Sequence, residues 1–119
     1  MTIYETVPEE NFKKFGDKNK LIEFLQENKG TFFTANTLAR KLGYRETNTQ
    51  VELRRDIAEA IESGYPIISN AKGFGWPVNS SQILFCIESL EARISGIKRR
   101  VNSLKKIYND LNEVNIYGN

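Results

Sequence analysis

The chain has 119 residues, with 17 Lys and Arg against 15 Asp and Glu, no His and a single Cys. A hydrophobic fraction of 39% and a charged fraction of 27% are typical of a folded protein rather than a disordered one. The lack of His and the single Cys exclude the usual zinc clusters, disulfide frameworks and His-based acid–base catalysis. We therefore expect no enzymatic activity, no metal and no cofactor.

The charge pattern divides the chain into segments. Residues 1–17 carry two Lys against four acids and few large apolar side chains, which predicts a flexible N-terminal arm. Residues 18–78 carry nine basic and seven acidic groups and hold the signals of a compact domain. Residues 79–112 predict one long helix, and residues 113–119 a tail. No apolar run resembles a signal peptide or could span a membrane, so we expect a cytoplasmic protein.

The compact domain begins with helical patterns separated by glycines. The expected elements up to residue 43 are a helix capped by Asp17 or Asn19 and closed at Gly30, a strand over Thr31–Phe33, and a short helix started by Thr34 or Asn36 and ended by Gly43. In a domain of this size most aromatic side chains are needed for the core. Phe24, Phe32, Phe33, Phe74 and Trp76 are assigned to it, and Tyr44 is the most plausible exposed exception.

A longer helix is expected from about Asn48 to Ser63. Its buried stripe at helical spacing is Leu53, Ile57, Ala60 and Ile61. The opposite face holds Asn48, Val51, Glu52, Arg55, Glu59 and Glu62. A hairpin follows, with a strand over Tyr65–Ser69, a turn over Asn70–Gly73 and a return strand over Phe74–Trp76.

Two short helices, a third helix and a hairpin are the order of a winged helix-turn-helix. The segments that carry the resemblance are Leu53–Ile57, Gly64–Ser69 and Lys72–Trp76. They resemble the winged-helix domains of biotin-operon-repressor and DeoR-type bacterial regulators, and of related small phage proteins. The resemblance covers about half of the chain and implies a mainly α-helical fold with a small β-hairpin. The connection after Gly43 is longer than such repressors usually have, so we expect either the turn before the third helix or the first turn of that helix to be extended.

In such a fold the third helix enters the major groove of duplex DNA. Asn48 and Arg55 are suited to bidentate contacts with adenine and guanine. Thr47, Thr49 and Gln50 at the helix start and Arg54, Arg45 and Lys72 around it are candidates for phosphate contacts. Residues 45–63 hold three Arg against five acids, however, which disfavours binding to phosphates. A solvated or protein-binding face therefore stays open as the alternative.

The most regular pattern lies near the C-terminus. Apolar residues fall at alternating steps of four and three, at positions 83, 87, 90, 94, 97, 101, 104, 108 and 111. This is the heptad repeat of a coiled coil. The a positions are Ile87, Ile94, Val101 and Tyr108, and the d positions are Ile83, Leu90, Ile97, Leu104 and Leu111. This stretch of about 43 Å needs a partner helix, and β-branched residues at a with Leu at d favour a two-stranded parallel coil.

The positions beside this repeat complicate the choice of partner. A parallel homodimer places Arg93 beside Lys98 and Arg100 beside Lys105 of the other chain, and both pairs repel. Either the apolar residues outweigh this repulsion, or the partner is an acidic protein, or the basic clusters face phosphates. The first reading is a small DNA-binding protein of a bacterial cell or a phage-infected host, which regulates transcription or assists replication or recombination and forms a homodimer or higher homo-oligomer. The second is a protein-interaction adaptor that keeps the scaffold without binding DNA.

Overall fold

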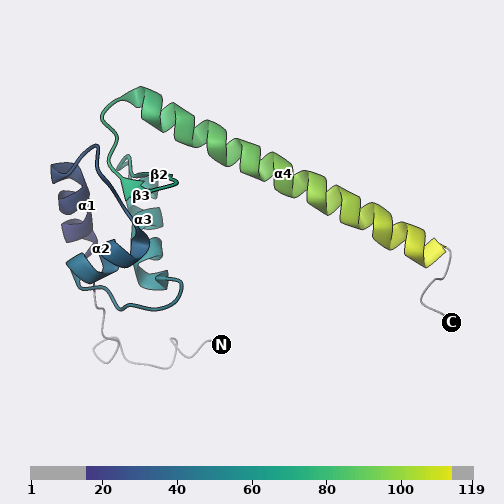
Figure 1. Ribbon diagram of the computed structural model, residues 1–119, viewed down its shortest axis with the longest axis horizontal. Helices are drawn as coiled ribbons and strands as arrows, with labels where there is room; N and C mark the ends of the chain where they lie inside the picture. Colours follow the sequence, from purple (N-terminus) through teal and green to yellow (C-terminus); the bar gives the residue numbers. More distant parts are fainter. Residues whose placement is uncertain (1–15, 114–119) are drawn as a thin grey trace. The chain divides into compact units, whose positions relative to one another are not determined.

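The computed structural model describes residues 16–113, and the chain forms two units that divide between Ile83 and Leu84 (Figure 1). Residues 1–15 of the predicted arm and residues 114–119 of the predicted tail lie outside the described part. Gly16 and Asp17, which the prediction placed in the arm, are held by the first unit. The main-chain N–H of Gly16 donates to Glu52 Oε1 at 2.9 Å.

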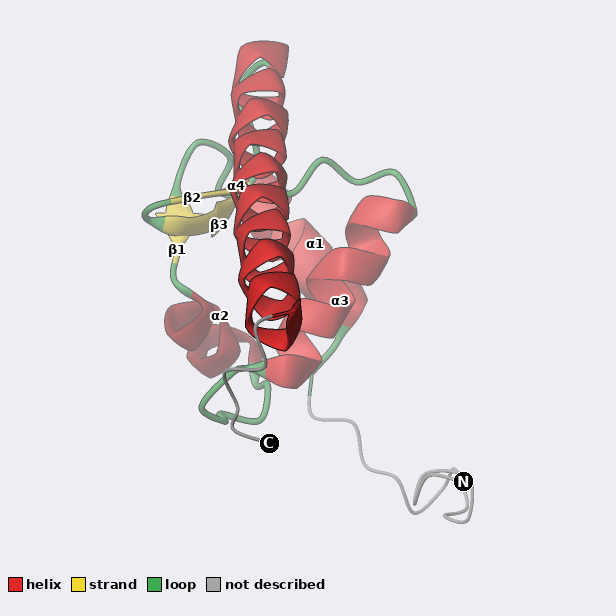
Figure 2. Cartoon of the chain, turned by 90° about the vertical axis from the view of Figure 1, so that its right-hand side faces the viewer, coloured by secondary structure: helices red, strands yellow, loops and turns green. Residues whose placement is uncertain are grey.

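The described part of the first unit has three helices and one small sheet. Its elements are α1 (Lys18–Glu27), β1 (Phe32–Phe33), α2 (Ala35–Leu42), α3 (Val51–Glu62), β2 (Ile68–Asn70) and β3 (Gly73–Gly75). The strands pair antiparallel in the order β1-β3-β2 and lie together at one side of the unit (Figure 2). A mainly helical fold with a small antiparallel sheet is therefore confirmed. The early short strand completes that sheet as its third member.

The helix boundaries follow from local chemistry. Asp17 Oδ1 accepts from the N–H groups of Asn19 and Lys20 at 2.9 and 3.4 Å, so Asp17 caps α1 as one of the two predicted options. Thr34 Oγ1 accepts from the N–H of Thr37 at 3.2 Å and caps α2. Gly43 ends α2 in the left-handed conformation, with φ of 76°.

The core lies where α1, α2 and α3 meet. Its fully buried apolar members are Leu21 and Leu25 from α1, Leu38 and Ala39 from α2, and Leu53 and Ala60 from α3. Four of the aromatic side chains assigned to the core, those of Phe24, Phe33, Phe74 and Trp76, are half-buried against it, which confirms their role. The helices thus bury one face each, and the small sheet covers the edge of the same core.

The β2–β3 hairpin depends on a glycine. Asn70 pairs with Gly73, so only Ala71 and Lys72 form the tip. Gly73 has φ of 128°, and a Cβ there would collide with the main-chain carbonyl of Phe33. Only a residue without a side chain permits this close approach between the hairpin and β1.

The third helix differs from its prediction at its start and in its buried stripe. It begins at Val51 rather than Asn48, because Gln50 adopts the left-handed conformation with φ of 52°. The eight residues between α2 and α3 confirm the extended turn. Ile61, predicted to be buried, is 47% exposed, and Asp56 is buried instead at 2% exposure. The helix packs against both α1 and α2, and the resulting buried stripe is Leu53, Asp56, Ile57 and Ala60.

The second unit consists of a single long helix. This is α4 (Ser80–Glu113), whose first turn is the end of the first unit. Asn79 Oδ1 accepts from the N–H of Gln82 at 3.1 Å and caps the helix. None of the described helices is long and apolar enough to cross a membrane.

Candidate nucleic-acid interface

The eight residues predicted to contact DNA come from three places in the first unit. Arg45, Thr47, Asn48, Thr49 and Gln50 lie in the irregular segment before α3, Arg54 and Arg55 on the first half of α3, and Lys72 at the hairpin tip. All are exposed except one. The structure therefore leaves seven of them accessible to a ligand.

Gln50 is the exception, and the burial of its side chain disfavours the predicted phosphate contact. Its side chain is only 4% exposed, and Nε2 donates to Asn36 Oδ1 of α2 at 2.8 Å. Its main-chain N–H donates to Thr47 Oγ1 at 2.9 Å. Gln50 thus joins the start of α3 to α2 and fixes the extended turn from within. Nothing in the sequence pattern indicates its pairing with Asn36.

Arg54 is positioned by contacts at both ends of its side chain. Its Nε donates to the main-chain carbonyl of Thr49 at 2.8 Å. Its guanidinium carbon lies 5.6 Å from the ring centroid of Phe74 on β3, within the range of a cation–π contact. Arg54 therefore connects the turn before α3 with the hairpin, and its guanidinium is held in place at the surface between them. Ordering before binding lowers the entropic cost of a contact with a ligand.

Three of the four acidic residues of α3 contact other parts of the first unit. Glu52 Oε1 accepts from the N–H of Gly16 at 2.9 Å, and Glu59 forms a 3.4 Å ion pair with Lys18 of α1. Asp56 is buried and accepts from the Tyr44 hydroxyl. These positions, 52, 56 and 59, share one side of the helix because of their spacing. Three of the five acids counted against phosphate binding are therefore directed at the protein itself.

Tyr44 makes this arrangement possible, and its predicted exposure is wrong. The side chain is 4% exposed, and its hydroxyl donates to Asp56 Oδ2 at 2.6 Å. Burial and the hydrogen bond to Asp56 raise the pKa of Tyr44 well above its ordinary value of 10.0. The phenol therefore keeps its proton at neutral pH and can serve as a donor to the buried carboxylate. The ring of Tyr44 belongs to the buried core cluster, so packing outweighs the polarity of its hydroxyl.

The outer face of α3 combines arginines with small apolar side chains. Its exposed residues at helical spacing are Val51, Arg54, Arg55, Ala58, Ile61 and Glu62. Only one of these six is acidic. Arg40 and Lys41, exposed in the last turn of α2, add cations beside the extended turn. They were not among the predicted contacts, although a basic pair just before the Gly43 helix end was visible in the sequence.

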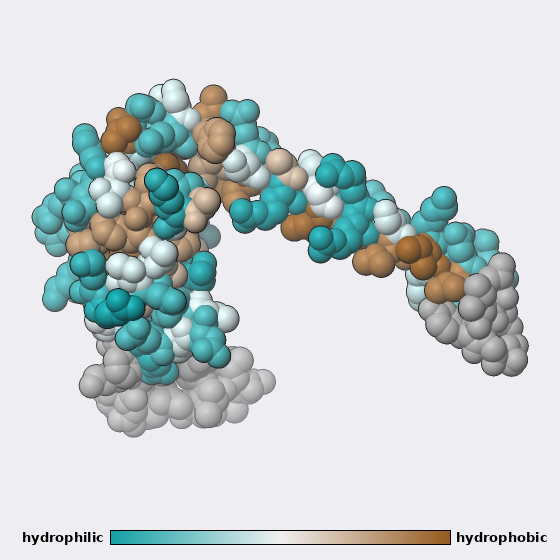
Figure 3. Space-filling view, viewed as in Figure 1, coloured by the Kyte–Doolittle hydropathy of each residue, from teal (hydrophilic) through white to brown (hydrophobic). Residues whose placement is uncertain are grey.

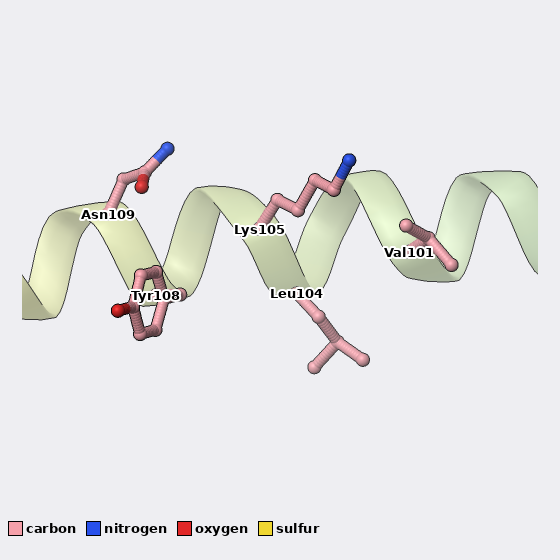
Figure 4. Close-up of a pocket in the computed structure, with 5 residues that line it drawn as sticks. All are labelled: Val101, Leu104, Lys105, Tyr108 and Asn109. Carbon is pink, nitrogen blue, oxygen red and sulfur yellow. The ribbon is translucent and has the colours of Figure 1, made fainter.

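The second unit presents the residues predicted for self-association. Eight of the nine predicted a and d residues, all except Ile83, lie in this unit. Seven of these eight side chains are between 42% and 64% exposed, and Leu111 is half-buried. Figure 3 shows apolar surface recurring along α4 between hydrophilic side chains. A shallow hollow on this surface is lined by Val101, Leu104, Lys105, Tyr108 and Asn109 (Figure 4). Residues i, i+3, i+4 and i+7 of one helix form the hole that receives a side chain from a facing helix in a coiled coil.

Comparisons with known proteins assign no family to this chain. No family model, no curated protein and no solved structure matches it. Residues 16–113 contain no group of three or more acidic or Cys side chains that could hold a metal ion. The candidate binding surfaces of the described residues are those of α3, the hairpin and α4.

Proposed function

We propose that the protein binds duplex DNA through a winged helix-turn-helix formed by residues 18–78 and self-associates through α4. It would act as a small bacterial or phage DNA-binding protein, either a transcriptional regulator or an accessory of replication or recombination. The order of elements supports the winged-helix assignment. Three helices enclose the core, the strand between α1 and α2 joins the sheet, and the β2–β3 hairpin follows α3 directly.

The observation that carries the proposal is the division of α3 into two polar sides. Its acids at 52, 56 and 59 bind groups of the same chain, while Arg54 and Arg55 lie on the exposed side with Val51 and Ala58. Arginine is the commonest side chain for bidentate contact with guanine, and small apolar side chains suit the methyl group of thymine. The exposed face of α3 that would meet the duplex is thus less acidic than the helix as a whole.

The hairpin tip supplies a second contact of a different kind. Lys72 is exposed, and its main-chain N–H donates to Asn70 Oδ1 at 2.8 Å, which fixes the backbone of the turn. A Lys on a short, rigid turn is suited to a phosphate rather than to a base edge, because its ammonium is a flexible point charge. We therefore assign base reading to Arg55 and phosphate contact to Lys72.

A salt titration of the intact protein with a fluorescent random-sequence duplex tests DNA binding. We expect the affinity to fall steeply between about 50 and 200 mM salt. Lys72→Ala should reduce the slope of log affinity against log salt by about 1. Arg55→Ala should weaken binding to a selected site by about 1–3 kcal/mol.

The matched control is Lys20→Ala, which removes one positive charge from the exposed side of α1. It should leave both the affinity and the salt slope close to those of the unmodified protein. Equal losses of affinity and of salt slope in Lys20→Ala and Lys72→Ala would indicate an effect of net charge alone. An unmodified protein without measurable binding at about 50 mM salt would refute the proposal.

A protein-interaction adaptor is the second candidate function. Ile61 is 47% exposed and Val51 is 52% exposed, so the outer face of α3 carries two large apolar side chains. Exposed apolar residues around a pair of arginines are also typical of protein interfaces. Absence of DNA binding, together with binding to an acidic protein partner that is lost in Ile61→Ser, would favour this second function.

Self-association is tested on the full chain with substitutions on and beside the a and d positions of α4. Ile94→Asp places a charge in the middle of the apolar stripe and should give a monomer of 13.7 kDa by light scattering. Ser95→Asp introduces the same side chain one position away, at an exposed outer site, and should keep the mass above that value. A monomeric unmodified chain would refute this part of the proposal.

A further inference from the structure

We infer that α4 pairs with α4 of a second copy in antiparallel orientation. This inference rests on the proposed self-association and specifies its geometry. The sequence pattern of the a and d positions favoured a parallel coil, whereas the charges along the helix favour the opposite direction. The two orientations place different charged residues of the helix beside one another.

A single helix of this composition leaves its apolar stripe in water. None of the side chains of α4 is buried, including those of Ile87, Ile94, Ile97 and Leu104. An exposed apolar stripe of this length is a sign of an interaction surface. The hollow around Leu104 has the geometry that accepts an apolar side chain from a facing helix. A second α4 offers such side chains at the matching spacing.

The charges of α4 are distributed unequally between its halves. Residues 80–97 hold Glu88, Glu91 and Arg93, for a net charge of −1. Residues 98–113 hold five basic side chains, Lys98, Arg99, Arg100, Lys105 and Lys106, against two acids, Asp110 and Glu113, for a net charge of +3. A parallel pair would place the basic halves together. An antiparallel pair places each basic half beside the acidic half of the other copy.

The residues that flank the apolar stripe lead to the same conclusion. In a parallel pair the g side chains face e side chains, so Arg93 meets the partner's Lys98 and Arg100 meets the partner's Lys105. Each contact occurs twice, and no opposite-charge flanking pair compensates for these four repulsions. In an antiparallel pair e faces e and g faces g. Glu91 can then meet the partner's Lys98 or the partner's Lys105, so attractions balance the remaining repulsions.

Two antiparallel alignments use nearly the whole stripe. In one, Ile94 lies opposite the partner's Ile97 and only Leu111 is left without a facing residue. In the other, Ile97 lies opposite the partner's Val101 and only Ile83 is left over. Both alignments bring Glu91 beside a lysine. Either one buries the hollow around Leu104 and covers the apolar side chains that a lone helix exposes.

Antiparallel pairing has a consequence for DNA binding. The first unit joins α4 at its N-terminal end, so the two copies of this unit would join the coil at opposite ends. At about 1.5 Å per residue, the two Leu84 positions would be about 35 or 45 Å apart along the coil, depending on the alignment. In a parallel pair they would be about 10 Å apart.

Distances between spin labels on the intact dimer distinguish the orientations. Cys86 is the only cysteine of the chain and accepts the first label directly. Ser95→Cys and Ile107→Cys, each in a Cys86→Ser background, supply the others. Antiparallel pairing predicts axial separations of about 29 or 39 Å at position 86, about 12 Å or less at position 95, and about 35 or 24 Å at position 107. Parallel pairing predicts label pairs at all three positions separated only by the width of the coil.

A charge reversal gives an independent readout on the same protein. Glu91→Lys replaces the attractive contact of the antiparallel pair and should raise the dimer dissociation constant several-fold. Glu88→Lys makes the same change at an exposed position away from the stripe and serves as the matched control. Equal effects of the two substitutions, or short distances at all three labels, would overturn the antiparallel arrangement but leave self-association standing. A monomeric mass for the unmodified chain would instead refute self-association itself, and DNA binding is decided separately by the salt titration.

Discussion

Replacing Tyr44 by Phe removes one oxygen atom from the interior of the first unit. The hydroxyl lost in this variant donates to Asp56 Oδ2 at 2.6 Å, and both side chains are almost fully buried. The aromatic ring stays, so the packing between α2 and α3 should be preserved. The substitution therefore isolates the polar contribution of Tyr44 to the position of α3.

The expected loss follows from the charge and burial of the acceptor. A hydrogen bond to a charged group contributes about 1.5–3 kcal/mol to stability. Asp56 is 2% exposed, so water cannot replace the missing donor without opening the core. We expect the free energy of unfolding to fall by about 2 kcal/mol.

Urea unfolding followed by the fluorescence of Trp76 measures this loss. Trp76 is the only tryptophan and packs against the core of the first unit, so it reports on that unit rather than on α4. Tyr65→Phe is the matched control, because Tyr65 is 43% exposed and its ring lies 6.5 Å from that of Trp76. Its hydroxyl loss should change the free energy of unfolding by less than about 0.5 kcal/mol.

The pH dependence supplies a second test of the same contact. The pKa of Tyr44 is raised in the folded protein, so the unfolded chain releases this proton first as the pH increases. The stabilisation is therefore present below about pH 10 and is lost progressively above it, by up to about 1.4 kcal/mol per pH unit. Tyr44→Phe has no hydroxyl to titrate, so its free energy of unfolding should lack the part of the decline above pH 10 that Tyr44 causes. Equal stabilities of the Tyr44 and Tyr65 variants, with identical alkaline profiles, would refute a structural role for the Tyr44–Asp56 hydrogen bond.

Two glycine substitutions test the hairpin and the long helix. Gly73→Ala should destabilise the first unit by more than about 1 kcal/mol, because φ is 128° and the new methyl group meets the Phe33 carbonyl. Gly64→Ala is the control, because φ is 104° there and no neighbouring atom lies within 4 Å of the new methyl group. It carries only the cost of the backbone conformation, so urea unfolding should show a smaller loss of stability. Gly96→Ala should stabilise α4 by about 1 kcal/mol, because the position is helical and the nearest atom to the new methyl group is the flexible Arg99 Nη2 at 3.7 Å. We expect a higher melting temperature by far-ultraviolet circular dichroism. An unchanged or lower melting temperature would contradict this prediction.

The helix ends and the core were predictable from the sequence because their causes are local. Asp17 and Thr34 are good capping residues placed directly before apolar helical patterns, and Gly43 permits the left-handed conformation that ends α2. The apolar periodicity of the third helix likewise identified Leu53 and Ala60, which are fully buried. These features depend on neighbours within about four residues along the chain, which a sequence displays directly.

The start of α3 was not predictable in the same way, because its cause lies in a different helix. Asn48, Thr49 and Gln50 are compatible with a helical first turn, and no residue among them is a strong helix breaker. The structure instead places Gln50 in the left-handed conformation, where its amide reaches Asn36 across a separation of fourteen residues. This tertiary contact supports the left-handed conformation together with the hydrogen bond from the Gln50 N–H to Thr47 Oγ1. The boundary therefore moved by three residues although the helix itself was predicted.

Tyr44 and Ile61 show how a buried acid changes a hydrophobic stripe. The predicted stripe was built from apolar residues alone, because acids are rarely buried, so it included Ile61 and left out Asp56. The Tyr44 hydroxyl satisfies Asp56 in the interior, which allows the acid to face the core. The stripe is then centred on Asp56 and Ile57, and Ile61 lies at its exposed edge.

The side of α3 on which each charged residue lies also decides what the charge of this helix means for binding. Counted along residues 45–63, acids exceed arginines by two, which disfavours a role on DNA. Placed in the fold, Glu52, Asp56 and Glu59 contact Gly16, Tyr44 and Lys18 respectively, so the acidic excess faces the protein. A ligand on the outer face meets Arg54 and Arg55 first. The distribution of charge around the helix, rather than its sum along the chain, determines which partner this surface fits.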